Sequence, residues 1–334
     1  MRLRCRRGGL WPSATHPHTA HMHNAVGASF SVSYADVPPV TFGKEKDESP
    51  TGDMVQANID IRPAENKSRG LKRDVVVYLK FIRMHLLIGL QYKGWWLMVL
   101  AVFVTCFTDI LPAYLLFSRM GNVGAWSWER ILLIYSLAVT SFGLAESFCR
   151  GFDYFPWQML RSGNFDRLLL RPRSLTTQVA GSFFHIHRLA RVTIGLSAAI
   201  WALGRLGVGA TPFSVSVITL ALIGGALVYS GVFVMSSGIS FYTIKALDWI
   251  YIVTNASYQV TRIPIDYMPP IFRRAFTFIM PMLVISYMPA AAVCGWNDAH
   301  PLTGYLALPA GIVFLALSHL VWKVGVRRYQ STGS

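Results

Sequence analysis

Long apolar runs, separated by short basic segments, make up most of the chain after about residue 70. A bilayer with a hydrocarbon core about 30 Å thick is crossed by roughly 20 residues of α-helix, so each run can be compared with that length. One run contains Arg188 and Arg191, which would have to reach toward the inner membrane surface, and it is the weakest candidate. The runs predict transmembrane helices at about 95–117, 131–148, 183–204, 213–238 and 302–322.

The stretch from 239 to 301 allows two interpretations. Residues 240–260 form one candidate span, and residues 275–296 form another that contains two prolines. Both cannot be complete spans if the two termini lie on the same side of the membrane. Internal prolines suit broken helices packed within protein, so we expect 240–260 to be the fifth of six spans and about 263–297 to be an outer re-entrant segment. The distribution of positive charge favours the opposite assignment, in which 275–296 is the fifth span.

Ahead of the first span, residues 71–96 combine an apolar stripe with interspersed lysines and arginines. Val76, Leu79, Ile82 and Leu86 recur at helical spacing. The pattern predicts an N-terminal helix that lies in the inner membrane interface and runs into the first span. The alternative is that this stretch is only the cytoplasmic end of that span.

The first 70 residues differ from the rest of the chain. They are polar, rich in Gly, Pro, Ser and His, and without sustained periodicity, so we expect them to be disordered. A further hypothesis is that translation starts at Met54, which would leave residues 1–53 untranslated. The expected organisation is therefore an extension over 1–70 and one membrane domain over 71–334.

Composition supports an all-α membrane protein. Of the 334 residues, 53% are hydrophobic and 14% are charged, which argues against a water-soluble globule. The net charge of +15 does not indicate nucleic acid, because the cations lie mainly between apolar runs, where they set topology. Their distribution places both termini in the cytoplasm. The four cysteines are scattered, with no spacing typical of a disulfide framework or a metal site.

The segment SGNFDRLLLRPRS, residues 162–174, lies in the basic loop after the second span and is therefore expected in the cytoplasm. It predicts a short helix that Asn164 caps, with Asp166 in the first turn and Arg171 near its end. Phe165, Leu168 and Leu169 then share one face. A short amphipathic helix of this kind is suited to docking a partner. The alternative is a helix that only covers the inner end of the bundle.

This segment also resembles the cytoplasmic loop of permease subunits in the type-2 class of ABC exporters. A second similarity is the proline-punctuated RIPIDYMPPIFRRAFTFIMPMLVISYMPAAAV at 262–293, and a third is the ending RRYQSTGS. The resemblance covers about 75–334. It implies a six-span permease in the cell inner membrane that dimerises with a second copy or a paralogue and binds a separate ABC ATPase subunit.

The resemblance also assigns roles to residues. It implies that the segment after the second span is a coupling helix formed by Gly163, Phe165, Asp166, Leu168, Leu169, Arg171 and Pro172. It implies that the re-entrant segment is punctuated by Pro264, Pro269, Pro270, Pro281 and Pro289.

The nucleotide chemistry is expected on another chain. The G-x-x-x-x-G-K-[ST] phosphate-binding motif is not found in this sequence, so no cofactor is expected here, and ATP and Mg²⁺ would bind the partner ATPase. We find no nucleophile with a base and no metal-ligand cluster, which argues against a membrane enzyme. The main rival is an ion-driven secondary transporter, which would favour inward-facing acids and an inverted repeat. For Asp109 and Glu146 we expect structural roles rather than a cargo site.

Overall fold

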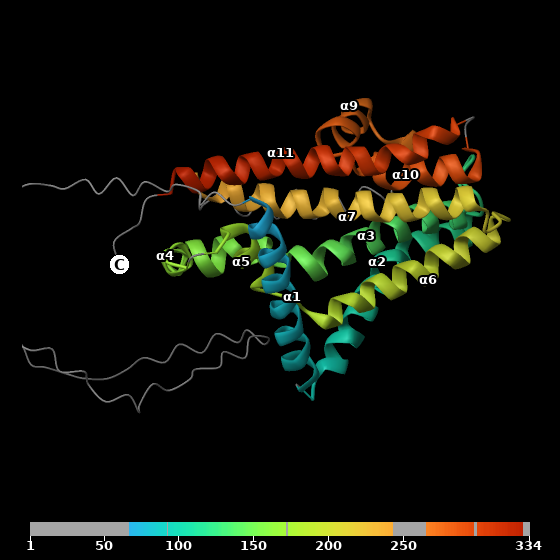
Figure 1. Ribbon diagram of the computed structural model, residues 1–334. Helices are drawn as coiled ribbons and strands as arrows, with labels where there is room; N and C mark the ends of the chain where they lie inside the picture. The colour runs from blue at the N-terminus through green and yellow to red at the C-terminus, as the bar shows by residue number, and fades with distance from the viewer. Residues whose placement is uncertain (1–66, 92, 172, 243–264, 297–298, 330–334) are drawn as a thin grey trace, which may run out of the picture. The chain divides into compact units, whose positions relative to one another are not determined.

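The computed structural model describes residues 67–91, 93–171, 173–242, 265–296 and 299–329 (Figure 1). Within these ranges the chain is helical, and the only β interaction is an isolated bridge between Val123 and Trp126. The prediction of an all-α membrane protein is confirmed. The longer helices are α1 (Lys67–Gln91), α2 (Trp95–Met120), α3 (Trp128–Phe155), α6 (Leu189–Arg205), α7 (Pro212–Ser240), α10 (Met282–Cys294) and α11 (Ala307–Arg327). Shorter ones are η1 (Pro156–Leu160), α4 (Phe165–Leu169), α5 (Leu175–Gly181), η2 (Ile186–Arg188), η4 (Ile265–Tyr267), α9 (Pro270–Arg274), η5 (Ala275–Ile279) and η7 (Pro301–Leu306).

Four helices of the described chain are long and apolar enough to cross a membrane. They are α2, α3 continued through η1, α7, and α11 continued from η7, and each overlaps one of the predicted spans. The predicted third span differs: α6 begins at Leu189 rather than near 183, because His185 is extended and a 3-10 turn follows it. With 17 residues, α6 is about 25 Å long, somewhat short of the bilayer core. The expected fifth span, 240–260, lies almost wholly outside the described residues, so the total of six spans stays a prediction.

The N-terminal helix is separate from the first span. We expected an interfacial helix within 71–96 that runs into the first span. In the structure α1 ends at Gln91 and α2 begins at Trp95, after a turn that includes Gly94. The two helices diverge from this turn (Figure 1). Gly94 lacks the β-carbon that limits the backbone conformations of other residues, so fixing it within a helix costs more free energy. This accounts for the interruption of the helical pattern there. Placement of α1 in the membrane interface stays a prediction.

The centre of the bundle is α3. It packs against α6, α7 and α10, and 89% of its most apolar 18-residue window is buried. Close approach is possible because small residues face each other: a β-carbon on Gly195 would lie 3.0 Å from the backbone nitrogen of Thr140. Being apolar and buried nearly all round, α3 has the pattern of a helix enclosed by others.

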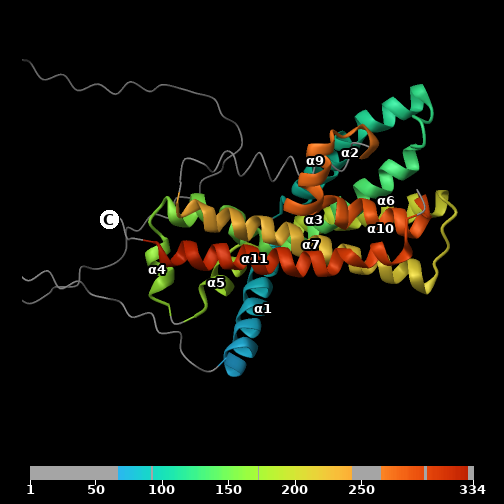
Figure 2. The ribbon, with the colours of Figure 1, turned by 90° about the horizontal axis from the view of Figure 1, so that it is seen from above.

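The helices α7 and α11 lie side by side along their length (Figures 1 and 2). Glycines recur every seven residues on α7, at Gly224, Gly231 and Gly238, and face Gly311, Ser318 and Gly325 on α11. A β-carbon on Gly238 would lie 2.8 Å from the backbone nitrogen of Trp322. A repeat of seven residues keeps one line of the helix facing its neighbour, so backbone meets backbone at Gly224 and Gly238, whereas Gly231 receives the side chains of Phe314 and Ser318.

The proline-rich segment before α11 is broken. The helical pair Pro270–Ile279 and Met282–Cys294 is bent by 96° at the break that contains Pro281. The second half, α10, has 13 residues, about 20 Å, and packs against α3, α7 and η7. Residues 275–296 therefore do not form one continuous spanning helix.

Candidate functional site

The predicted coupling segment begins where α3 ends. Helix α3 continues as the π-turn η1, and the chain then turns at Gly163, whose φ of +72° lies in the left-handed region that glycine adopts without strain. Helix α4 follows and has only five residues, Phe165–Leu169.

The prediction that Asn164 caps α4 is wrong. The backbone of Asn164 is helical, with φ −68° and ψ −10°, and its side chain makes no capping hydrogen bond. Instead its Nδ2 donates to Ser162 Oγ at 2.8 Å and to the carbonyl oxygen of Gln158 at 3.4 Å. The amide thus stabilises the turn before the helix rather than the helix itself.

Phe165 anchors α4 to the bundle. Its side chain is fully buried, and its ring lies edge-on to those of Tyr329, Phe155 and Phe241, with centroids 4.7, 5.3 and 5.5 Å away. Phe155 ends α3, Phe241 follows α7, and Tyr329 follows α11. Such edge-to-face pairs are each worth about 0.5–1.5 kcal/mol beyond burial. One side chain of the segment is thus packed against the ends of three long helices.

Asp166 makes the second contact to the end of the chain. The hydroxyl of Tyr329 donates to Asp166 Oδ1 at 2.9 Å. Burial of the phenol raises the pKa of Tyr329, and the hydrogen bond to Asp166 raises it further. The neutral, donating form of Tyr329 is therefore the stable one.

The other side of α4 faces outward. Leu168 is half-buried against the aromatic cluster, whereas Leu169 is 41% and Leu170 84% exposed. We predicted that Phe165, Leu168 and Leu169 share one face, but the structure buries the first and exposes the last. Leu170 projects most and was not selected from the sequence, although a third consecutive leucine before Arg171 was a signal. Pro172 lies outside the described residues.

Helix α5 holds α4 in place. Its Gln178 is 4% exposed, and Nε2 donates to the carbonyl oxygens of Arg173 at 3.1 Å and Leu168 at 3.4 Å. Ser174 caps α5 by accepting a hydrogen bond from the backbone nitrogen of Thr177. Because α5 also packs on α1 and α3, the segment contacts the N-terminal helix as well as the bundle.

The prolines of the predicted re-entrant segment mark its turns. Pro269 precedes α9, Pro270 is its first residue, Pro281 lies at the break, and Pro289 is buried within α10. Pro264 lies outside the described residues.

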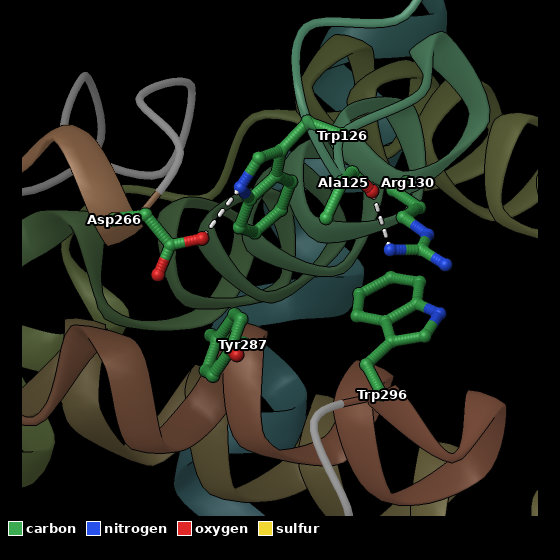
Figure 3. A pocket seen from close by; sticks show the side chains of 6 residues that line it. All are labelled: Ala125, Trp126, Arg130, Asp266, Tyr287 and Trp296. Carbon is green, nitrogen blue, oxygen red and sulfur yellow. Dashed lines mark hydrogen bonds between the residues drawn. The ribbon is translucent and has the colours of Figure 1, made fainter.

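Two links attach this segment to the start of α3. Trp126 Nε1 donates to Asp266 Oδ2 at 2.9 Å, and the guanidinium of Arg130 lies 5.1 Å from the ring centre of Trp296 (Figure 3). Tyr287 lies between the two links, and the gap that remains is about 10 Å³, at the lower limit for one water molecule. This arrangement is a structural connection rather than a ligand site.

A buried ion cluster lies within the bundle, and sequence reasoning found it only in part. Glu146 on α3 is 2% exposed and is approached by nitrogen atoms of Arg150 at 2.5 Å, Arg188 at 3.1 Å and Arg191 at 3.2 Å. The two arginines at the start of the predicted third span therefore do not simply reach for the membrane surface, as we had expected. The sequence did contain a signal for this cluster, because it places a carboxylate in one apolar run and cations in a neighbouring one.

Comparison with known proteins agrees with this architecture. The family model for ABC-2 family transporter proteins matches residues 103–333. No curated protein and no solved structure matches the chain. The match covers α3 to α11 and most of α2, including α4 and the proline-rich segment. With a helical membrane domain and a family match over more than half of its length, the chain belongs to the ABC-2 family of transporter proteins.

Proposed function

We propose that this chain is the permease subunit of an ATP-driven exporter, and that α4 with the residues after it binds a separate ATPase subunit. ATP and Mg²⁺ bind that partner, and two permease chains, identical or paralogous, form the transport path. Both termini and α4 lie in the cytoplasm of a multi-pass protein in the cell membrane.

The observation that carries the proposal is the two-sided exposure of α4. Phe165 is fully buried against α3, α7 and α11, while Leu170, five residues later, is 84% exposed. A helix that only covered the bundle end would turn its apolar side chains inward. Here one side of the segment is fixed to the helices that would move, and the other offers an apolar side chain to a partner.

Charge supports the proposed orientation. The end of the bundle that carries α4 lies beside the C-terminal end of α11 in both views (Figures 1 and 2). Six exposed arginines belong to these two stretches, whereas the opposite end of the bundle carries Arg119 near the end of α2, Arg130 in the first turn of α3 and Arg205 at the end of α6. Positive residues concentrate on the cytoplasmic side of membrane proteins. The six are Arg161, Arg167, Arg171, Arg173, Arg327 and Arg328.

The ion-driven alternative has less support. Such a transporter would use carboxylates that can gain and lose ions within the spans. The buried carboxylate of α3, Glu146, is instead held by three arginines. The family match also favours an ATP-driven system.

The test is a co-purification of the tagged full chain from its native membrane in mild detergent. Wild type is compared with Leu170→Glu, and proteins that co-purify are identified by mass spectrometry. A protein with a nucleotide-binding motif is expected with wild type and on the order of tenfold less with Leu170→Glu, because a carboxylate replaces the most exposed apolar contact.

Leu302→Glu is the matched control, since Leu302 is 65% exposed in η7, before α11 begins, away from α4. It should retain the ATPase. Equal recovery in wild type and Leu170→Glu would overturn the assignment of α4 as the contact, and an intact wild-type protein without any ATPase would overturn the proposed function.

A further inference from the structure

A second site lies on the lipid-facing side of the bundle, where α2 approaches η2 and α6. A pocket of about 220 Å³ separates them. Its α2 wall consists of Met98, Ala101, Val102 and Thr105, and the Thr105 hydroxyl already donates within the helix to the carbonyl oxygen of Ala101 at 2.8 Å. Because the hydroxyl hydrogen of Thr105 is already used, this wall offers a ligand mainly apolar contacts.

The opposite wall is cationic. It is formed by His187, Arg188 and Arg191. Both arginines also contact Glu146 behind the pocket, as Arg150 does, and Arg150 further pairs with Asp153 at 3.2 Å. In these ion pairs, three guanidinium groups share two carboxylates.

The arginines of this wall also retain unused donors. Arg191 is 7% exposed, and the Nε–H groups of Arg188 and Arg191 are buried without a hydrogen-bond partner. Buried donors are nearly always paired in folded proteins. Both guanidinium groups line the pocket, and each carries several N–H donors in a planar arrangement that matches phosphate oxygens, so both suit an anionic acceptor there.

The pocket opens beside an apolar surface at membrane-interface depth. Only 11% of the most apolar window of α2 is buried, and Leu100, Phe103 and Phe107 are each at least half exposed. Trp95 and Trp96, exposed at the start of α2, are typical of the membrane interface, and Met98 follows one helical turn later. A ligand here would meet cations at one end and hydrocarbon at the other.

We propose that this pocket binds the phosphate headgroup of an anionic membrane phospholipid, with Arg188 and Arg191 as donors and the acyl chains along the exposed face of α2. The phosphate chemistry is shared with free inorganic phosphate, but the apolar wall favours the lipid. This proposal does not depend on α4 or on an ATPase.

The experiment uses the full chain in neutral detergent, titrated separately with phosphatidylglycerol, phosphatidylcholine and inorganic phosphate. The thermal unfolding midpoint is followed by tryptophan fluorescence, and retained lipid is counted by native mass spectrometry. We expect phosphatidylglycerol to raise the midpoint and to bind on the order of tenfold more tightly than phosphatidylcholine, with no comparable effect of phosphate.

Two variants locate the binding. Arg188→Gln removes one donor and should weaken phosphatidylglycerol binding on the order of tenfold. Ala101→Trp fills the pocket and leaves every charge in place, so it should weaken binding similarly even if Arg188→Gln does not fold. Val313→Trp is the control, because Val313 is 58% exposed on α11, outside both the pocket and the face of α2 that would carry the acyl chains.

Three results would overturn the proposal. The first is equal affinity for the two phospholipids, and the second is full binding by Ala101→Trp. The third is an equal response to inorganic phosphate, which would assign the site to a free anion instead of a lipid.

Discussion

The hydroxyl of Tyr329 donates to Asp166 Oδ1 at 2.9 Å, although 163 residues separate the two in the chain. This hydrogen bond joins the second residue after the last helix to the first turn of α4. The ring of the same tyrosine packs on Phe165 with a centroid distance of 4.7 Å. The end of the described chain and the proposed coupling segment are thus connected through one side chain.

Tyr329→Phe keeps the ring contact and removes the hydrogen bond, so it should lower stability by about 1 kcal/mol at neutral pH. The effect should depend on pH. The folded-state pKa of Tyr329 is raised above its ordinary value of 10.0, so its contribution is complete below pH 10 and is lost as pH rises through the folded-state pKa.

Thermal unfolding midpoints of wild type and Tyr329→Phe, measured between pH 7 and 11, check this. The difference between the two proteins should narrow above pH 10. A constant difference across the whole range would show that the hydrogen bond is not responsible.

Phe165→Ala should destabilise the protein by about 3–5 kcal/mol, because the fully buried ring leaves a cavity among the ends of three helices. Phe278→Ala is the control, since Phe278 is 82% exposed in η5. Midpoints in detergent measure the effect. Similar midpoints for both variants would contradict the role of Phe165 as the anchor of α4.

Glu146→Gln should destabilise the protein by about 3–5 kcal/mol, because it leaves the guanidinium groups around it without their shared carboxylate. Glu129→Gln in the first turn of α3 removes the same charge from a helix N-terminus and should cost about 0.3–1 kcal/mol. Chemical or thermal unfolding in detergent would compare them. A small loss of stability in Glu146→Gln would contradict this prediction and would mean that water or lipid phosphate balances the charge of the arginines.

Gly238→Ala should destabilise the protein by about 1–3 kcal/mol, since the new β-carbon would lie 2.8 Å from the backbone nitrogen of Trp322. Gly204→Ala makes the same change within α6, where nothing lies within 4 Å of the added carbon. It should be neutral or stabilising by about 0.5–1 kcal/mol. We expect a lower unfolding midpoint for Gly238→Ala and an unchanged or higher midpoint for Gly204→Ala, and equal losses in the two variants would contradict the close packing at Gly238.

Much of the fold could be predicted from hydropathy, because the cost of unpaired backbone in lipid makes an apolar run of sufficient length helical. The runs at α2, α3, α7 and α11 carried that signal. Hydropathy did not indicate the start of α6, because the apolar pattern continues through Phe183 and Phe184 while the backbone there is not helical. The break between α1 and α2 depends on one glycine within a pattern that is helical on both sides.

The candidate site was predictable in its location and less so in its contacts. Gly163, Asn164 and Pro172 marked a short helix in the sequence, but whether Asn164 caps it depends on a backbone angle that the sequence does not determine. The burial of Phe165 depends on Phe241 and Tyr329, which are far away in the chain. The buried position of Glu146 required knowledge of which faces of α3 and α6 meet.

The seam of glycines between α7 and α11 has a mechanical consequence. The backbones approach closely at Gly224 and Gly238, and Gly231 packs tightly on the side chains of Phe314 and Ser318, so little space lies between the two helices for repacking when one of them is pushed. Phe241 and Tyr329, which hold Phe165, follow the ends of this pair. We therefore expect a force applied at α4 to displace α7 and α11 together and to be carried along their shared seam toward the far end of the bundle.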